Sequence, residues 1–459
     1  MAKYKAYPEY KDSGVEWLRD IPKHWNVTPI GRLFWRLKRT GYIYKTLLSV
    51  YRDYGVIPKT SRDDNYNKPS EDLSPYQLVK PNDLVMNKMK AWQGSIAISE
   101  YEGIVSPAYF VYPPNAKLFE VAYPKYIHYL LRNPMYIAQY LRRSKGIRVN
   151  QWDLDPDEFQ KIELLLPTKD EQLKIFNFLD HETTKIDTLI EKQQQLIALL
   201  KEKRQAVISH AVTKGLNPDA SMKNSGVEWL GEVPEHWRIT RMKYISLLTP
   251  KKPVIQRNLH CSFVPMEKLK TNSIVLDETR IIDDVYDGYT YFKDADILMA
   301  KVTPCFENKN IAVAKNLVNS IGFGSSEIYV IRANEDISNR FLYYRLQEDS
   351  FMETATASMT GAGGLKRVPS DFINNYIITL PNLSEQQRIA EFLDPKCSVF
   401  SKLIENTESM ITLMQEKRTS LISAAVTGKI DVRNWQDSRT SNKEEMEKNN
   451  KEALHEFTR

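Results

Sequence analysis

The sequence has little cysteine and no long hydrophobic run, and each absence removes a class of protein. Only three cysteines occur among 459 residues, and no two of them lie close together along the chain: Cys261, Cys305 and Cys397. This spacing argues against a disulfide framework and against a zinc site. No stretch approaches the ~18 uninterrupted apolar residues of a membrane-spanning helix, and the N-terminus lacks the apolar core of a signal peptide. We therefore expect a cytoplasmic protein of two to four domains.

Catalytic sequence motifs are also missing. Residues 361–366 are rich in glycine but lack the GxxxxGK[ST] spacing of a phosphate-binding loop. No GxSxG or HExxH sequence occurs, and the seven histidines are scattered. Residues 112–115 (YPPN) carry the amino-methyltransferase tetrapeptide in reversed order. We predict no catalytic residue and no metal site in this chain.

The charge is only mildly basic. The formal net charge is +6 and the pI is about 8.8. A nucleic-acid surface, if one exists, must therefore be local, because the chain as a whole carries no large excess of positive charge.

What the sequence does contain is a repeat. Three blocks occur twice in one order: SGVEWL at 13–18 and 225–230, P-x-HW at 22–25 and 234–237, and EKR…IS.AVT at 202–213 and 416–427. Chance does not give so many identities in one register. A duplicated chain can present two similar faces to a target that has two parts.

The repeat divides the chain into segments. We expect a first α+β domain over 1–166, a long helix over 167–215, a second α+β domain over 216–380, a second long helix over 381–430 and a polar, unpacked tail over 431–459. Within the first domain, apolar residues from Tyr126 to Leu141 have helical spacing that is interrupted near Pro134. Residues 95–99 and 105–112 each have the pattern of a strand.

Both long helices carry a heptad pattern. The apolar a and d positions fall in corresponding places: Leu179, Ile186, Leu189, Leu196, Leu200 and Val207 in the first helix, and Leu393, Phe400, Leu403, Met410, Met414 and Leu421 in the second. Such a stripe must be buried against a partner, and the nearest candidate is the other helix. The alternative is that each stripe packs on its own globular domain.

Antiparallel pairing would relate the two halves by a pseudo-two-fold axis. The segment 13–25 has no helix before it, whereas its twin follows the first long helix directly. In a pseudo-symmetric fold the N-terminal segment should therefore pack beside the end of the second helix, near Gly428, and the chain would be nearly circular.

Four loops in the two α+β domains favour nucleic-acid binding. They combine cations for phosphates, amides for base edges and an aromatic side chain for stacking. The residues that we predict to contact DNA are Lys88, Lys90, Trp92, Gln93, Arg143, Lys145, Arg148 and Asn150 in the first domain, and Lys301, Thr303, Lys366 and Arg367 in the second. The alternative for each cluster alone is an ordinary solvated loop. The framing blocks match closely between the halves while these loops differ, as expected of two readers with separate preferences.

At this point the chain resembles the specificity subunit of Type I restriction–modification systems. The resemblance rests on the repeated blocks, on LLLP and ITLP at 164–167 and 378–381, and on Phe-Leu-Asp near the start of each long helix. It implies two target-recognition domains, each reading one half of a split DNA site, separated by antiparallel helices. The helices would set the spacer and dock methyltransferase subunits, two of them in our reading.

The resemblance places the cofactors on partner subunits. It implies S-adenosylmethionine on the methyltransferases, and ATP and magnesium on a motor–nuclease subunit, with no cofactor in this chain. Two other readings stay open: a coiled-coil scaffold whose domains bind proteins and not DNA, and a self-sufficient DNA-modifying enzyme, against which the absent motifs argue.

Overall fold

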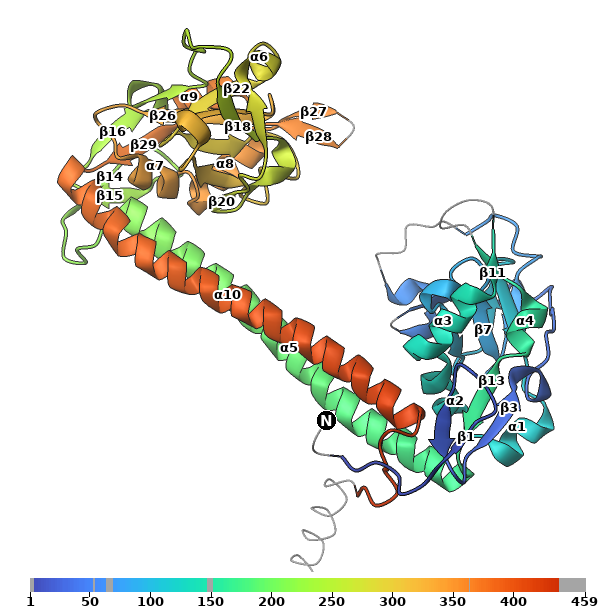
Figure 1. Ribbon diagram of the computed structural model, residues 1–459. Helices are drawn as coiled ribbons and strands as arrows, with labels where there is room; N and C mark the ends of the chain where they lie inside the picture. The colour runs from blue at the N-terminus through green and yellow to red at the C-terminus, as the bar shows by residue number, and fades with distance from the viewer. Residues whose placement is uncertain (1–3, 53, 63–68, 147–151, 363, 437–459) are drawn as a thin grey trace, which may run out of the picture. The chain divides into compact units, whose positions relative to one another are not determined.

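A computed structural model describes residues 4–52, 54–62, 69–146, 152–362 and 364–436 (Figure 1). The chain divides into two compact units by its internal contacts. Unit 1 consists of Met1–Lys192 with Met410–Arg459, and unit 2 of Gln193–Ser409. Both units mix helices and strands, as the α+β prediction requires. Each is described by itself.

Unit 1 has short antiparallel strands and four short helices ahead of the first long helix. The strands are β1 (Tyr10–Asp12), β2 (Asp20–Pro22), β3 (Asn26–Pro29), β4 (Leu48–Tyr51), β5 (Gly55–Pro58), β6 (Gln77–Val79), β7 (Leu84–Asn87), β8 (Ile96–Ile98), β9 (Gly103–Val105), β10 (Tyr109–Tyr112), β11 (Ser144–Lys145), β12 (Asp153–Leu154) and β13 (Glu163–Leu166). The helices are α1 (Ala116–Val121), α2 (Pro124–Leu131), α3 (Pro134–Arg142) and α4 (Pro156–Gln160). The central sheet has the order β10-β7-β8, and β13 pairs with β3.

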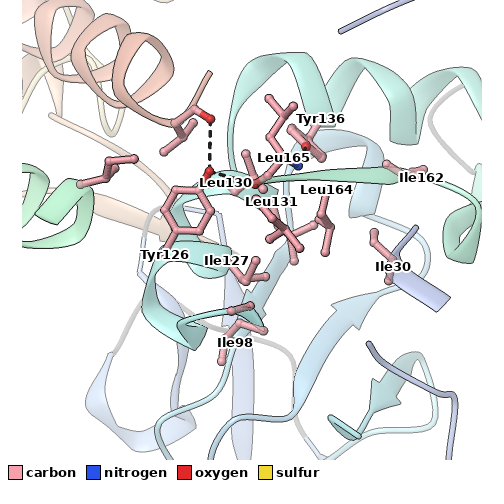
Figure 2. Close-up of a cluster of buried hydrophobic side chains, with 14 of the residues drawn as sticks. Ile30, Ile98, Tyr126, Ile127, Leu130, Leu131, Tyr136, Ile162, Leu164 and Leu165 are labelled. Atoms are coloured by element: carbon pink, nitrogen blue, oxygen red, sulfur yellow. Dashed lines mark hydrogen bonds between the residues drawn. The ribbon is translucent and has the colours of Figure 1, made fainter. Parts of the chain in front are cut away.

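The helical pattern from Tyr126 to Leu141 forms two helices, and the break lies where it was predicted. The side chain of Asn133 caps α3 by accepting from the Met135 amide at 2.8 Å, and Pro134 takes the first helical position. Helix α2 buries one face in the core that Figure 2 shows. There the Tyr126 hydroxyl donates to the Leu165 carbonyl at 2.9 Å, which fixes α2 against β13. The region predicted as one strand over 105–112 is divided between β9 and β10.

Unit 2 repeats this plan with larger sheets. Its strands are β14 (Met222–Asn224), β15 (Glu232–Pro234), β16 (Arg238–Arg241), β17 (Ser246–Leu248), β18 (His260–Val264), β19 (Leu269–Lys270), β20 (Ser273–Ile274), β21 (Thr279–Ile281), β22 (Thr290–Lys293), β23 (Ile297–Ala300), β24 (Ile311–Val313), β25 (Ile321–Gly324), β26 (Ile328–Ala333), β27 (Thr360–Ala362), β28 (Leu365–Arg367) and β29 (Ile377–Leu380). Its short helices are α6 (Ile282–Val285), α7 (Asn339–Arg345), α8 (Asp349–Ala357) and α9 (Ser370–Asn375). Two four-stranded sheets have the orders β17-β26-β23-β24 and β21-β18-β25-β22.

Two long helices, α5 (Lys169–Lys214) and α10 (Leu383–Val426), contribute to both units. Each is followed within two residues by a glycine with positive φ, Gly215 at +78° after α5 and Gly428 at +74° after α10, the conformation that favours glycine after a helix end. In unit 1 the first part of α5 shares a core with the last part of α10. In unit 2 the last part of α5 shares a core with the first part of α10. The helices are therefore antiparallel where they meet within each unit.

The predicted helix seam is wrong at four positions. Leu189, Leu196, Leu403 and Met410 are exposed, between 42% and 46% of each side chain. The apolar neighbour one residue later takes the inward place in each case: Ile190, Ile197, Ile404 and Ile411. The other eight predicted seam residues are buried or half-buried. At the four wrong positions two adjacent residues are both apolar, so hydrophobicity alone does not choose between them.

The N-terminal segment lies beside the end of α10, as the repeat order predicted. The Tyr10 hydroxyl donates to the carbonyl of Gly428 at 2.9 Å, and the Asp431 amide donates to the Lys5 carbonyl at 2.8 Å. A Cβ added at Gly428 would come within 2.5 Å of Pro22, so the close approach itself requires glycine.

The prediction that packing ends at residue 430 is also wrong. Val432 is buried, and the Trp435 ring lies 5.6 Å from that of Phe178 in an edge-on contact. The Phe178 side chain is in turn contacted by Tyr4, with ring centres 5.2 Å apart. The start of the polar tail thus covers the Phe178 side chain of α5. The charged composition of the tail gave no indication of this contact. Residues 437–459 lie outside the described part.

The repeated motifs form the same hydrogen bonds in both units. In unit 1, His24 Nε2 lies 2.7 Å from Glu171 Oε2, and the Trp25 indole donates to Glu171 Oε1 at 3.1 Å. In unit 2 the equivalent distances are 2.8 Å from His236 and 3.2 Å from Trp237 to Glu385. The two histidines thus hold the first turn of a long helix, which is a structural role.

The glutamine that follows each glutamate joins the long helix to the domain before it. The Gln172 amide group donates to the carbonyls of Val121 and Pro167 and accepts from the Tyr123 amide. Gln386 makes the three corresponding bonds, to Asp336, Pro381 and Ser338. Both glutamine side chains are fully buried.

We expect Gln386→Ala to lower the free energy of unfolding by about 2–4 kcal/mol, because three buried backbone groups lose their partner. Gln195 on α5 is exposed, so Gln195→Ala serves as the control and should change the free energy by less than ~0.5 kcal/mol. Denaturant unfolding of the two variants measures both values. Equal, small effects would show that these three bonds are dispensable.

We expect a half-buried histidine, His128, to make the stability of unit 1 sensitive to acid. Burial, with the Arg132 charge beside it, lowers the pKa of His128 to about 3. The ring accepts from Arg132 through Nε2 at 2.8 Å and also bonds the backbone of Ile98. The neutral ring is therefore the folded form.

Below pH ~6.5 the unfolded chain binds a proton at His128 that the folded chain does not, so stability falls as pH decreases toward 3. We expect His128 to lower the free energy of unfolding by about 2 kcal/mol when the pH falls from 7.5 to 5. Unfolding measured at both pH values should show a smaller loss for His128→Gln than for the original chain. Parallel pH profiles would contradict the assignment.

Within the described residues, no helix is long and apolar enough to cross a membrane.

Candidate nucleic-acid interface

In unit 1 the fold brings the two predicted basic clusters together. Strand β7 ends at Asn87, and Lys88 and Lys90 follow in the next turn. The second cluster returns through β11 and β12, and the Leu154 amide donates to the Lys88 carbonyl at 3.2 Å. Lys145 lies in β11 opposite Asp153. Residues distant in sequence thus share one rim of the domain.

The turn after β7 depends on Gly94. Its φ is +93°, and an added Cβ would lie 2.7 Å from the Ile137 side chain. The left-handed backbone favours glycine here, and a larger residue would also displace the end of the Ile137 side chain. The close packing against α3 fixes the short segment 91–93, which carries Trp92 and Gln93.

Sequence reasoning missed one aromatic residue of this rim. Trp152 lies against Trp92, with ring centres 5.1 Å apart in an edge-on arrangement, and the Trp92 indole donates to the Met89 carbonyl at 3.0 Å. Trp152 directly follows the predicted polar cluster, so its proximity to that cluster was the available signal. The pair forms an aromatic surface on which a base could stack.

The predicted cations of unit 1 differ in how available they are. Lys90 is exposed and has no ion pair among the described residues. The Lys88 ammonium lies 3.8 Å from Asp153, and the Lys145 ammonium 3.4 Å from Asp155. Arg143 donates to the Gln139 side chain and is half-buried. Among these cations, the Lys90 ammonium is therefore the most available to a DNA phosphate. Arg148 and Asn150 lie outside the described residues.

Unit 2 joins its two predicted loops by direct hydrogen bonds. Lys301 follows β23 as Lys88 follows β7, and its carbonyl accepts from the Val368 amide at 2.9 Å. The Thr303 amide donates to the Lys366 carbonyl, and the Lys366 amide donates to the Thr303 hydroxyl, both at 3.0 Å. The glycine-rich stretch that carries Lys366 is the hairpin β27–β28.

The cations of this loop pair are also unequal. Glu327 receives two bonds from the Arg367 guanidinium, each 2.9 Å long, and this contact lowers the pKa of the glutamate. The Lys301 ammonium lies 5.4 Å from the centre of the Tyr329 ring. Lys366 is exposed and has no acidic partner among the described residues. Of the predicted contacts in unit 2, Lys366 is the most available to a phosphate.

Each unit has an ion pair with a buried carboxylate next to its strand of the candidate interface. Asp83 and Asp296 stand just before β7 and β23 and pair with Arg39 and Arg332 respectively. Arg332 forms two bonds of 2.7 Å to Asp296. In the described residues no group of three histidine, cysteine or acidic side chains could hold a metal ion.

The arrangement defines a class of protein: a duplicated chain in which one framework carries two different basic loop pairs. Residues 267–412 match the family model described as the Type I restriction modification DNA specificity domain. The chain therefore carries that domain, and the resemblance drawn from its repeated motifs is confirmed.

Curated relatives and a solved structure agree with this assignment. The chain is 39% identical to the specificity subunit of the Type I restriction enzyme EcoAI of Escherichia coli over 161 residues, 34% of this chain and 27% of that relative. It is 22% identical to the MjaVIII specificity subunit of Methanocaldococcus jannaschii over 428 residues, 90% of this chain and 95% of that one. A chain from a structure of complex assembly and conformational transition in the Type I R-M system has the same fold, with a TM-score of 0.65 and 14% identity over 88% of this chain and 98% of that one. The match to EcoAI spans less than a third of that relative's length.

Proposed function

We propose that this chain is the DNA specificity subunit of a Type I restriction–modification complex. Each α+β domain reads one half of a bipartite DNA site, through residues 1–166 in the first domain and 216–380 in the second. The observation that carries the proposal is the same construction in both units. A cation-bearing turn after a central strand is bonded to a second basic loop, and the residues of the two loop pairs differ.

The long helices have two roles in this proposal. Over residues 167–215 and 381–430 they form an antiparallel pair that sets the spacer between the half-sites and docks methyltransferase subunits, two per chain. Each unit has exposed apolar side chains on these helices: Leu189, Met410 and Leu413 in unit 1, and Leu196, Leu199, Val399 and Leu403 in unit 2. Single exposed leucines are ordinary, but a set along a helix surface is typical of a binding face.

Catalysis belongs to the partners in this scheme. The methyltransferases would bind S-adenosylmethionine and flip the target base, while a motor–nuclease subunit would use ATP and magnesium. The described residues supply phosphate and base contacts, and the repeated histidines are engaged in holding helices.

Reconstitution with a Type I methyltransferase subunit from the same host tests the proposal. The mixture of this chain, the methyltransferase and S-adenosylmethionine should methylate a split DNA sequence. When the gene is deleted from the host, methylome sequencing should show that the same sequence is no longer methylated. Methylation that persists without this chain, or a complex that does not retain DNA, would favour the protein-binding scaffold instead.

A further inference from the structure

Unit 2 contains a polar cavity of about 400 Å³ beside the parts of α5, α7 and α10 that belong to this unit. It is lined by residues of α5, α7 and α10 together with nearby loops. Its charged lining residues are Arg204, Lys315, Arg340 and Asp394. Three cations and one acid therefore surround a space large enough for a small solute.

The one acidic side chain of the cavity, Asp394, already has partners for both of its oxygens. Asp394 is ion-paired with Arg340, and its other oxygen accepts from the Tyr344 hydroxyl at 2.7 Å. It therefore has little capacity left to neutralise the remaining cations. Lys315 is exposed and has no acidic partner among the described residues.

The Arg204 guanidinium is the unsatisfied group. It is half-buried, and its Nε is shielded from solvent without a hydrogen-bond partner. The Arg204 charge also acts on Lys309, whose pKa is lowered chiefly by burial and additionally by the nearby Arg204. A buried guanidinium N–H without an acceptor is rare in native proteins.

The repeat shows what is missing. Arg204 stands in EKR as Arg418 does in the second copy, and Arg418 forms two bonds to Asp187, of 2.8 Å and 3.2 Å, within unit 1. The position that corresponds to Asp187 in the second long helix is Ser401, and Ser401 lines the cavity together with Arg204. Unit 2 thus keeps the arginine and the space but lacks the carboxylate.

We propose that this cavity binds an oxyanion, through the Arg204 guanidinium, in the place that the Asp187 carboxylate takes in unit 1. A guanidinium presents parallel N–H groups that match two oxygens of a carboxylate or a phosphate. Ser401 and Ser398 add hydroxyl donors from α10. This role is independent of DNA recognition.

The test measures thermal unfolding of the full chain at constant ionic strength, with chloride replaced by inorganic phosphate in one arm and by acetate in the other. An anion that binds only the folded chain raises the unfolding temperature, and the rise grows with the logarithm of its concentration above the dissociation constant. We expect a rise of several degrees in at least one arm, and the arm that responds identifies phosphate or carboxylate as the preferred chemistry.

Two variants locate the site. Arg204→Gln should abolish the rise, and Ser401→Asp, which restores the internal carboxylate, should abolish it while raising the unfolding temperature in chloride. Arg418→Gln is the matched control and should keep the full response. The proposal would be overturned by no rise in unfolding temperature in either arm, or by an equal rise in the original chain and in Arg204→Gln. For variants that fold, isothermal titration with phosphate or acetate measures anion binding directly.

Discussion

Exchanging residues 26–160 for the corresponding segment of another specificity subunit will change one half of the recognised DNA sequence and leave the other half unaltered. The exchanged segment contains the turn with Lys88 and Lys90 and the β11–β12 pair, whose Leu154 amide bonds to that turn. Both belong to unit 1. Because no predicted contact of unit 2 lies within the segment, the second half-site should keep its bases.

The graft is feasible because its ends lie side by side. Residue 26 begins β3, and β3 pairs with β13, which begins three residues after the segment ends. This pairing uses backbone groups, which any sequence supplies. The Glu171 and Gln172 contacts that hold the long helix involve only residues outside the segment or backbone groups within it.

Methylome sequencing of cells that carry the exchanged gene gives the readout. A new half-site should be preferred over the old one by about 1–3 kcal/mol for each base pair that differs. The reciprocal exchange of residues 238–375 serves as the control and should change only the other half. If either exchange altered both halves, the domains would not read DNA independently.

The sequence alone indicated which loops to consider, because the repeat supplied a second copy of each, but it did not predict that the loops of one domain bond to each other. Lys88 and Lys301 follow corresponding strands, and in both units a distant basic loop bonds to that turn. What a single sequence could not predict is which cations are already neutralised. The pairing of Arg367 with Glu327 depends on tertiary packing, in which the Tyr329 hydroxyl of β26 donates to the Val368 carbonyl just after the hairpin, and nothing in local sequence places those residues together.

The helix seam shows a second limit of sequence reasoning. At Leu189-Ile190 and at Leu403-Ile404 two apolar residues are adjacent, and a repeat of alternating three- and four-residue steps fits either one. Tertiary packing selects the isoleucine and leaves the leucine exposed. The exposed set is then available to a partner, so the error in the seam bears on the proposed methyltransferase dock.

Replacing Lys88 and Lys90 with alanine will weaken DNA binding by about tenfold or more at moderate salt, with little change in which sequence is preferred. Each lysine that neutralises a phosphate releases about one counterion, so the salt dependence of log K should become shallower by about one for each lost contact. Lys90 should account for the larger share, because Lys88 is already 3.8 Å from Asp153. In unit 2 the loss of DNA affinity should likewise be larger for Lys366→Ala than for Arg367→Ala, because the Arg367 side chain is already ion-paired with Glu327.

Fluorescence anisotropy of labelled duplex, titrated with the complex of this chain and its methyltransferase at several salt concentrations, measures both quantities. Lys117→Ala in α1 is the matched control, because this lysine is exposed and lies outside the predicted interface. Unchanged affinity and slope in the double variant would remove the turn after β7 from the interface. A loss confined to one base position would instead mean that these lysines read bases, because phosphate contacts weaken every sequence alike.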